Sequence, residues 1–324
     1  MIKITRRLTL GIFLSLPGTH ILAQPAWPER PVRLIVPFPP GGSNDIVARF
    51  LAESLRDKLG QPFLVENRSG AGGNIGADIV AKASPDGHTL LISAPPAFAI
   101  NEHLYRTMPF SPERDLIPVA LIAQVPIVLM VPADSPARSL AELIAMARRE
   151  PGRLTFGSSS IGGTNHLAGE LLKSLAAIDI VHVPYRGAAP AVTDAVAGRI
   201  EILMADVPAI LSQVRGGTLR PLGISAPKRL DILPDLPTLV EAGLPDMICD
   251  TSYGLVAPAG TPAERITLLR NAMVAALNDP ETRQAFAAQG GTLVGGTPEE
   301  FTQAIREGSA RWGQVVRAGN IKLE

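Results

Sequence analysis

Three features are scarce in this sequence, and each scarcity excludes a class of protein. There is one cysteine, Cys249, so no intramolecular disulfide can form. No segment approaches the roughly 18 uninterrupted apolar residues that a membrane-spanning helix needs, so we expect no permanent membrane anchor. Basic and acidic residues balance at 30 each. That balance gives no reason to expect nucleic acid or an anionic membrane surface as a partner.

Metal and nucleotide chemistry also lack their usual residues. Four of the five histidines, His88, His103, His166 and His182, do not have the mutual spacing of a helical or zinc-type site. The glycine-rich run at 70–76 lacks the third glycine of a dinucleotide loop, and no Gly-Lys-Ser/Thr phosphate loop occurs. We therefore expect neither a metal nor a cofactor.

A hydrolase is the enzyme class that the sequence comes nearest to supporting. Its candidate residues are Ser158, Ser159, Ser160, His166, His182 and Asp206. The run Gly157-Ser158-Ser159-Ser160-Ile161 fails the Gly-x-Ser-x-Gly nucleophile elbow at its last position, however. A serine-rich turn before a helix is typical of capping and hydrogen bonding. We expect a protein that is not an enzyme, with a secreted hydrolase as the weaker alternative.

The amino terminus has the pattern of a secretory signal peptide. Three basic residues, including Arg6 and Arg7, precede an apolar run at 8–16, and small residues follow near Ala23. We expect residues 1–23 to be cleaved, with Ala26 as an alternative site and twin-arginine export as an alternative route. The remaining chain has 27 basic and 30 acidic residues, a net charge of −3. It should act in the periplasm.

Apolar runs alternate with helical patterns after residue 32, as in parallel strands joined by crossover helices. Expected strands lie at 32–36, 63–67 and 89–93, and the same alternation restarts with a strand at 154–157 and a helix at 164–175. About 300 mature residues exceed what one core usually serves, so we expect two α/β lobes.

Two extended apolar segments, at 119–131 and 253–257, are expected to connect the lobes. The three helical patterns that follow, at 262–277, 280–289 and 298–318, indicate a return to the first lobe. We assign residues 24–125 with 250–324 to lobe 1 and residues 126–249 to lobe 2. Two crossings form a hinge that allows closure around a ligand.

A similar glycine turn opens a helix in each lobe. Gly41-Gly42-Ser43 in the first and Gly162-Gly163-Thr164 in the second expose backbone N–H groups at a helix start. Such a start carries partial positive charge and can hold a carboxylate without a basic side chain. Facing each other across a cleft, the two turns would grip an organic acid. The alternative is that both are ordinary strand–helix connections.

Four further polar residues near these turns have two interpretations each. Asp45 lies in a first helical turn, where a carboxylate is favourable in any case, so it is either structural or a residue that orients waters or a ligand amino group. Asp206 follows the expected strand 202–205 and is more suggestive of a ligand contact. Tyr185 either lines the cleft or is half-buried at the surface, and Arg186 is either an anion partner or a solvated loop residue.

Motifs along the whole mature chain resemble the tripartite tricarboxylate transporter receptor family, called Bug proteins in Bordetella-type bacteria. The matching runs are 27–28, 30–32, 36–45 (VPFPPGGSND), 65–68, 70–76, 83–87, 157–158 with 162, 166–167, 183–187 (VPYRG), 236–238, 254–262 (GLVAPAGTP) and 321–323. Any one of these motifs is weak alone, but their order and combination are specific. Two departures are the absence of a tryptophan at 250–253 and the small Ala205 before Asp206.

The resemblance implies a type II, Venus-flytrap periplasmic binding protein with two hinge crossovers. It implies a receptor that captures a small carboxylate, such as an amino acid, an aromatic acid or a di- or tricarboxylate, for tripartite-type transport. A two-component membrane permease is the implied partner, and a membrane signalling protein that the receptor would serve as a sensing subunit is the alternative. We expect a monomer.

Residue reasoning and resemblance together give one candidate set for the ligand site. Its members are Phe38, Pro40, Gly41, Gly42, Ser43, Asp45, Ser93, Ala94, Ser158, Ser159, Gly162, Thr164, His166, Tyr185 and Asp206. The identity of the acid does not follow from the sequence.

Overall fold

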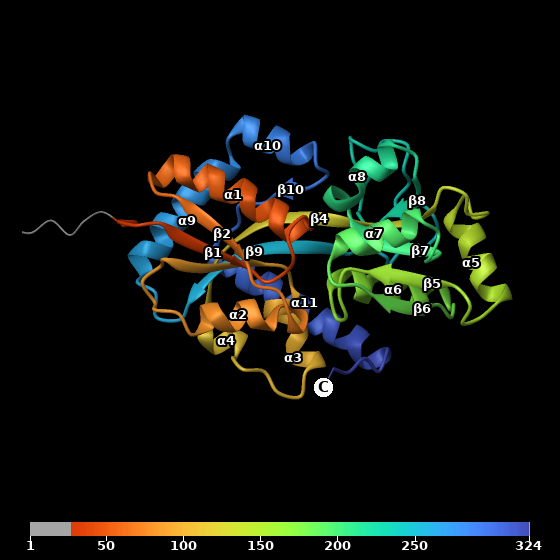
Figure 1. Ribbon diagram of the computed structural model, residues 1–324, viewed down its shortest axis with the longest axis horizontal. Helices are drawn as coiled ribbons and strands as arrows, with labels where there is room; N and C mark the ends of the chain where they lie inside the picture. The colour runs from red at the N-terminus through yellow and green to blue at the C-terminus, as the bar shows by residue number, and fades with distance from the viewer. Residues whose placement is uncertain (1–26, 324) are drawn as a thin grey trace, which may run out of the picture.

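The protein has two α/β lobes side by side, joined through a central pair of strands (Figure 1). The computed structural model describes residues 27–323, so the expected signal peptide lies outside the described residues. Within this described range, no helix has both the length and the apolar character needed to span a bilayer.

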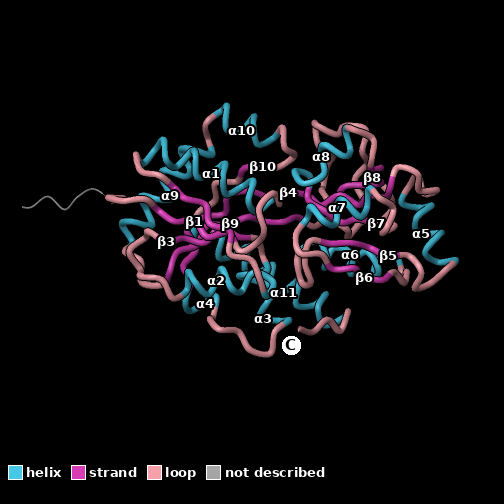
Figure 2. Tube along the Cα trace, in the orientation of Figure 1, coloured by secondary structure: helices cyan, strands magenta, loops and turns pink. Residues whose placement is uncertain are grey.

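Lobe 1 is built on a sheet of three parallel strands that continues into the hinge. The strands β1 (Val32–Val36), β2 (Phe63–Asn67) and β3 (Thr89–Ser93) lie in the order β2-β1-β3. All three coincide with the expected segments. Helices cover both faces of this sheet, as near-continuous apolar strands require (Figure 2).

The helices of lobe 1 begin and end where the sequence signals lie. Left-handed Gly60, with φ of 71°, ends α1, as the sequence predicted. The helical elements, with one short strand, are α1 (Ser43–Leu59), η1 (Ala71–Gly73), α2 (Asn74–Ala81), η2 (Pro96–Ile100), α3 (Asn101–Leu104), α4 (Pro112–Asp115), α9 (Ala263–Leu277), α10 (Pro280–Ala287) and β10 (Thr292–Leu293).

Lobe 2 repeats the parallel arrangement with its own strands and helices. Its strands β5, β6 and β7 are parallel in the order β7-β5-β6. The elements are α5 (Leu140–Arg149), β5 (Thr155–Ser158), α6 (Thr164–Ala176), β6 (Val181–Pro184), α7 (Ala188–Val196), β7 (Ile202–Asp206), α8 (Val207–Arg215) and β8 (Leu219–Ile224). The carboxyl ends of β5 and β7 thus face lobe 1's glycine turn.

Two antiparallel strands connect the lobes, as the sequence predicted. The long strand β4 (Leu116–Pro132) pairs with β9 (Asp250–Pro258) from Leu116 to Pro126 and with β7 from Ile127 to Met130. One continuous strand therefore belongs to the sheets of both lobes. Its residues from 119 to 131 are buried except Gln124, which explains the long apolar run in the sequence.

The carboxy-terminal helix α11 (Pro298–Ala318) is a third connection, one that the sequence did not reveal. Near its start Phe301 packs in the core of lobe 1, whereas Trp312 and Val316 pack in the core of lobe 2. A capping box between Thr297 and Glu300 fixes where the helix begins. The helix was assigned to lobe 1, but its contacts thus extend into lobe 2. The residue ranges given for the two lobes stay a prediction.

The position of Trp312 in the core of lobe 2 predicts that its removal destabilises the whole protein. The indole is 4% exposed, and Trp312→Ala should lower the free energy of unfolding by about 3 to 5 kcal/mol, measured by urea denaturation. The exposed replacement Gln303→Ala in the same helix should change it by less than about 0.5 kcal/mol. Equal effects of the two replacements would show that the end of α11 is not part of this core.

Candidate functional site

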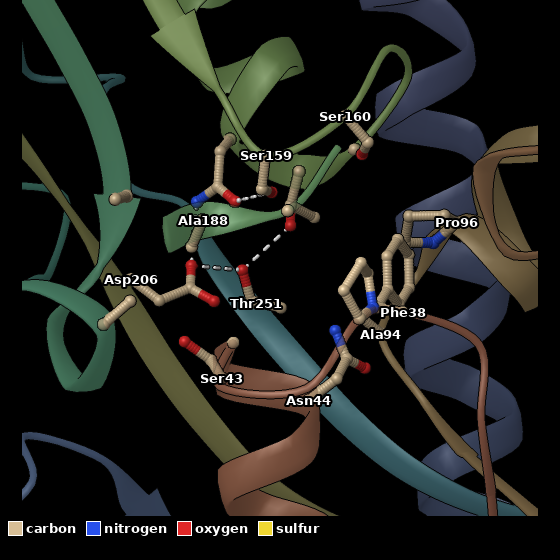
Figure 3. A pocket seen from close by; sticks show the side chains of 18 of the residues that line it. Phe38, Ser43, Asn44, Ala94, Pro96, Ser159, Ser160, Ala188, Asp206 and Thr251 are labelled. Carbon is tan, nitrogen blue, oxygen red and sulfur yellow. Dashed lines mark hydrogen bonds between the residues drawn. The ribbon is translucent and has the colours of Figure 1, made fainter. Parts of the chain in front are cut away.

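A pocket lies between the lobes, at the carboxyl ends of β5 and β7. Its cavity volume is about 40 Å³, so the pocket is narrow in this arrangement of the two lobes. The lining residues are Phe38, Pro39, Gly42, Ser43, Asn44, Ala94, Pro96, Ser159, Ser160, Gly163, Thr164, Asn165, Gly187, Ala188, Ala205, Asp206, Ala209, Thr251 and Tyr253. Figure 3 shows polar side chains from both lobes around it.

Two helix starts face this pocket, one from each lobe. Gly42 is the N-cap of α1 and Gly163 the N-cap of α6, and neither helix has a side-chain cap. The first residues of both helices, Ser43 and Thr164 among them, line the pocket. Their leading backbone N–H groups have no partner within the helix, so they and the helix dipoles make the pocket attractive to an anion.

A buried carboxylate, Asp206 at the end of β7, anchors the polar wall of the pocket. Its Oδ1 accepts hydrogen bonds of 2.8 Å from Asn165 Nδ2 and from Thr251 Oγ1. Its Oδ2 accepts one of 2.6 Å from the Tyr253 hydroxyl. Asn165 in turn accepts from Ser159 Oγ at 3.0 Å. Residues of α6, the β5–α6 turn and the hinge strand β9 are joined in one network.

Burial raises the pKa of Asp206, and the hydrogen bonds from Tyr253, Asn165, Thr251 and Ser43 oppose that rise. Burial together with the neighbouring carboxylate raises the pKa of Tyr253 well above its ordinary value. The phenol therefore remains a donor. The 2.6 Å contact has the length typical of a charge-assisted O–H···O⁻ bond.

Part of the lobe 1 side of the pocket is apolar. Phe38, Ala94 and Pro96 lie together there (Figure 3). Lobe 2 contributes small side chains from its own side: Ala188, Ala205 and Ala209. Among residues 27–323, no lysine, arginine or histidine lines the pocket. A bound anion would have to rely on neutral donors.

The structure brings seven of the fifteen sequence-predicted residues to the pocket. These are Phe38, Gly42, Ser43, Ala94, Ser159, Thr164 and Asp206. Eight others lie outside its lining: Pro40, Gly41, Asp45, Ser93, Ser158, Gly162, His166 and Tyr185. That the seven bind a ligand stays a prediction.

Asp45 and Gly41 shape the first glycine turn from behind the pocket. Asp45 Oδ2 accepts from the Gly41 backbone N–H and from Arg49 Nε, each at 3.0 Å, and Oδ1 accepts from Asn67 Nδ2 at 3.1 Å. Burial raises the pKa of Asp45, but these hydrogen bonds outweigh it and lower the value overall. The carboxylate is used within the turn, as its structural interpretation implied.

Ser158, Gly162 and His166 belong to a buried cluster beneath the second turn. The rings of His166 and His182 stack at 3.7 Å between centroids, and the Gly162 N–H donates to His166 Nδ1 at 3.0 Å. Ser158 Oγ donates to the carbonyl of Ser160, so His182 Nε2 supplies the proton of its 2.7 Å contact with Ser158. A histidine that donates to a fully buried serine does not activate it as a nucleophile.

Four further residues that the sequence placed near the cleft do not line the pocket: Tyr185, Ser93, Pro40 and Arg186. Tyr185 donates its hydroxyl to Asp194 Oδ2 at 2.8 Å, and burial raises its pKa to about 12. Ser93 is fully buried at the end of β3, and Pro40 is exposed. Arg186 is absent from the lining.

Twelve lining residues are not members of the candidate set, although Gly163 belongs to the second glycine turn that the sequence predicted to grip the acid. They are Pro39, Asn44, Pro96, Ser160, Gly163, Asn165, Gly187, Ala188, Ala205, Ala209, Thr251 and Tyr253. Asn44, Gly163 and Asn165 were within reach, because they stand in the two glycine turns already singled out. Thr251 and Tyr253 carried only a weak signal, since their strand was assigned as a hinge and the alternation of its faces was not considered.

Comparison with known proteins finds relatives that cover nearly the whole chain. Residues 47–321 match the family described as tripartite tricarboxylate transporter family receptor. The chain is 38% identical to the protein BugT of Bordetella pertussis over 97% of each chain. A structure of an R. palustris protein with adipate shares 38% identity and a TM-score of 0.89, covering 91% of this chain and 99% of that one. MatC from Rhodopseudomonas palustris with bound malate shares 31% identity and a TM-score of 0.84, covering 90% and 100%.

The stacked histidines predict a stability that falls in mild acid. Burial lowers the pKa of His166 to about 3 and that of His182 to about 4. Between about pH 6.5 and pH 4, both histidines are therefore protonated in the unfolded chain but neutral in the folded protein. Stability should therefore decrease as the pH falls, by about 4 kcal/mol for the pair between pH 7 and pH 5.

Urea unfolding at both pH values measures this loss. The double variant His166→Gln with His182→Gln should lose less stability than the parent over the same interval. An identical loss in both proteins would assign the acid sensitivity to other groups.

Proposed function

The chain belongs to the tripartite tricarboxylate transporter receptor family, and from this premise we propose that it is an exported receptor that closes on a small carboxylate in the pocket between its lobes. The family consists of solute-binding receptors rather than enzymes, which agrees with the donor role of His182 toward Ser158. The predicted signal sequence supports a periplasmic location.

One observation carries the proposal: two helix starts without side-chain caps meet at one pocket. Gly42 and Gly163 contribute no capping side chain, so the N–H groups that follow them are left for a ligand. Because no basic side chain lines the pocket among the described residues, these dipoles are the main source of positive potential. A carboxylate is the anion whose two oxygens fit two such groups of donors.

Contacts across the pocket support closure as the capture step. The turn that holds Pro39 in lobe 1 meets the one that holds Gly187 in lobe 2, since a Cβ built at Gly187 would lie 3.4 Å from the Pro39 ring. Ser43 on α1 faces Asp206 of lobe 2 (Figure 3). A ligand between them is removed from water, which strengthens its hydrogen bonds to fixed donors.

The ligands of similar proteins support the carboxylate class. Two similar structures from R. palustris are of proteins with adipate and with bound malate, both dicarboxylates of short chain length. Because the chain belongs to this receptor family, we propose that it delivers its acid to the membrane components of a tripartite-type transporter.

Thermal unfolding of the mature protein with a panel of acids tests the proposal. An acid at about 100 times its dissociation constant should stabilise the folded state by about 2.7 kcal/mol and raise Tm by about 5 °C. The panel should contain amino acids, aromatic acids, and di- and tricarboxylates. A panel without any shift would count against a carboxylate receptor.

Two replacements of Gly42, one large and one small, test whether the acid binds in this pocket. Its φ is −87°, and a Cβ there would meet only the Pro39 carbonyl at 3.8 Å, so Gly42→Leu should fold and block the pocket, whereas Gly42→Ala should retain most binding. Gly162 is unsuitable, because its φ is 73° and a Cβ would lie 2.1 Å from Leu104. Unchanged binding by folded Gly42→Leu would place the acid elsewhere.

A further inference from the structure

The hydroxyl groups around Asp206 have their protons directed inward, away from a ligand. Asp206 is bonded to Asn165, Thr251 and Tyr253, and it accepts from all three, as a carboxylate does. Each of the two hydroxyl groups has one proton. Thr251 and Tyr253 thus give that proton to Asp206 and keep none for a molecule in the pocket.

The direction of the next hydrogen bond follows from this. Thr164 Oγ1 and Thr251 Oγ1 lie 2.8 Å apart. Since the proton of Thr251 goes to Asp206, the proton of this contact must come from Thr164. Thr164 lines the pocket and is 3% exposed. Its oxygen therefore presents only lone pairs to the pocket.

A second group of the lining has the same polarity. Ser159 donates its hydroxyl proton to Asn165 Oδ1 at 3.0 Å, because the amide NH₂ of Asn165 faces Asp206. The oxygens of Ser159 and Thr164 are thus acceptors that lobe 2 places close to the start of α6.

The pocket consequently has two kinds of surface side by side. The backbone N–H groups at the starts of α1 and α6 need an acceptor, and the oxygens of Thr164 and Ser159 need a donor. A simple carboxylate satisfies the first surface and leaves the second without partners. An unmade hydrogen bond in a closed pocket weakens binding considerably.

We propose that Asp206 acts as a positioning residue that fixes this polarity, and that the receptor selects acids with a hydroxyl or ammonium group on the carbon next to the carboxylate. This inference rests on the proposed function. Thr164 is the first residue of α6, so its oxygen and the helix-start N–H groups are close enough for one small ligand group each. An ammonium group is also compatible with the charge of Asp206, since no lysine, arginine or histidine lines the pocket in the described part of the chain.

Matched acids with one carbon skeleton test the selection. Titration calorimetry of the mature protein would compare malate and aspartate with succinate, and 2-hydroxyadipate and 2-aminoadipate with adipate. We expect the receptor to bind acids of at least one of these two chain lengths. In that series, at least one substituted acid should bind about tenfold or more tightly than the unsubstituted acid. Equal affinities would overturn the inference and leave the proposed function intact, whereas no binding by any acid would contradict the proposed function itself.

Variants of the network locate the source of the selection. Thr164→Val keeps the shape of the side chain and removes the acceptor, so it should reduce the preference to about threefold or less while the unsubstituted acid still binds. The exposed Thr193, which bonds only to Ala189 within α7, provides the control Thr193→Val, which should keep the full preference. A preference unchanged in Thr164→Val would overturn the role given to Thr164.

Asp206→Asn tests the positioning role separately. An amide offers the network a donor where the carboxylate offered only acceptors, so hydroxyl groups are free to turn toward the pocket. The folded variant should bind the substituted and the unsubstituted acid of a pair with similar affinity. Retention of the parent's preference would show that Asp206 does not set the polarity. If this variant does not fold, Thr164→Val decides the inference.

Discussion

The antiparallel pairing of β4 with β9 is the constraint on which the two lobes and the pocket depend. β4 continues from the sheet of lobe 1 into that of lobe 2, so the carboxyl ends of β5 and β7 are held opposite the first glycine turn. Side chains alternate along β9: Thr251 and Tyr253 face the pocket, whereas Asp250 and Ser252 line a separate cavity against α11. The hinge strand thus supplies part of the site itself.

The burial of Asp206 determines the character of the polar wall. A carboxylate without water is stable only when donors surround it, and here the donors come from α6 and β9. Those donors are then unavailable to a ligand. The same network that stabilises a buried charge therefore decides which hydrogen-bonding groups the pocket offers. In the proposed selection of acids, this network links the packing of lobe 2 to the solute that is bound.

Glycine at the two helix starts has the complementary effect. A serine or aspartate N-cap would satisfy the first N–H groups of α1 and α6 with its own oxygen, as Ser139 does for α5. With Gly42 and Gly163 in these positions, the N–H groups remain available. The adjacent polar residues act from behind, since Asp45 closes the first turn and the stacked histidines pack beneath the second. Under the proposed function, anion recognition in this pocket is thus a property of backbone placement.

The sequence by itself determined the two α/β lobes, the strands from β1 to β3, the two hinge crossings and the pair of glycine turns, because each depends on local patterns of apolar residues and on turn chemistry. Only the tertiary structure decided which residues of those turns line the pocket. Gly42 and Ser43 face it while Gly41 and Asp45 do not, although all four stand within five positions of one another. The contribution of β9, the bridge made by α11 and the donor directions around Asp206 were also decided there, because they depend on contacts between residues more than 40 positions apart, which no local pattern records.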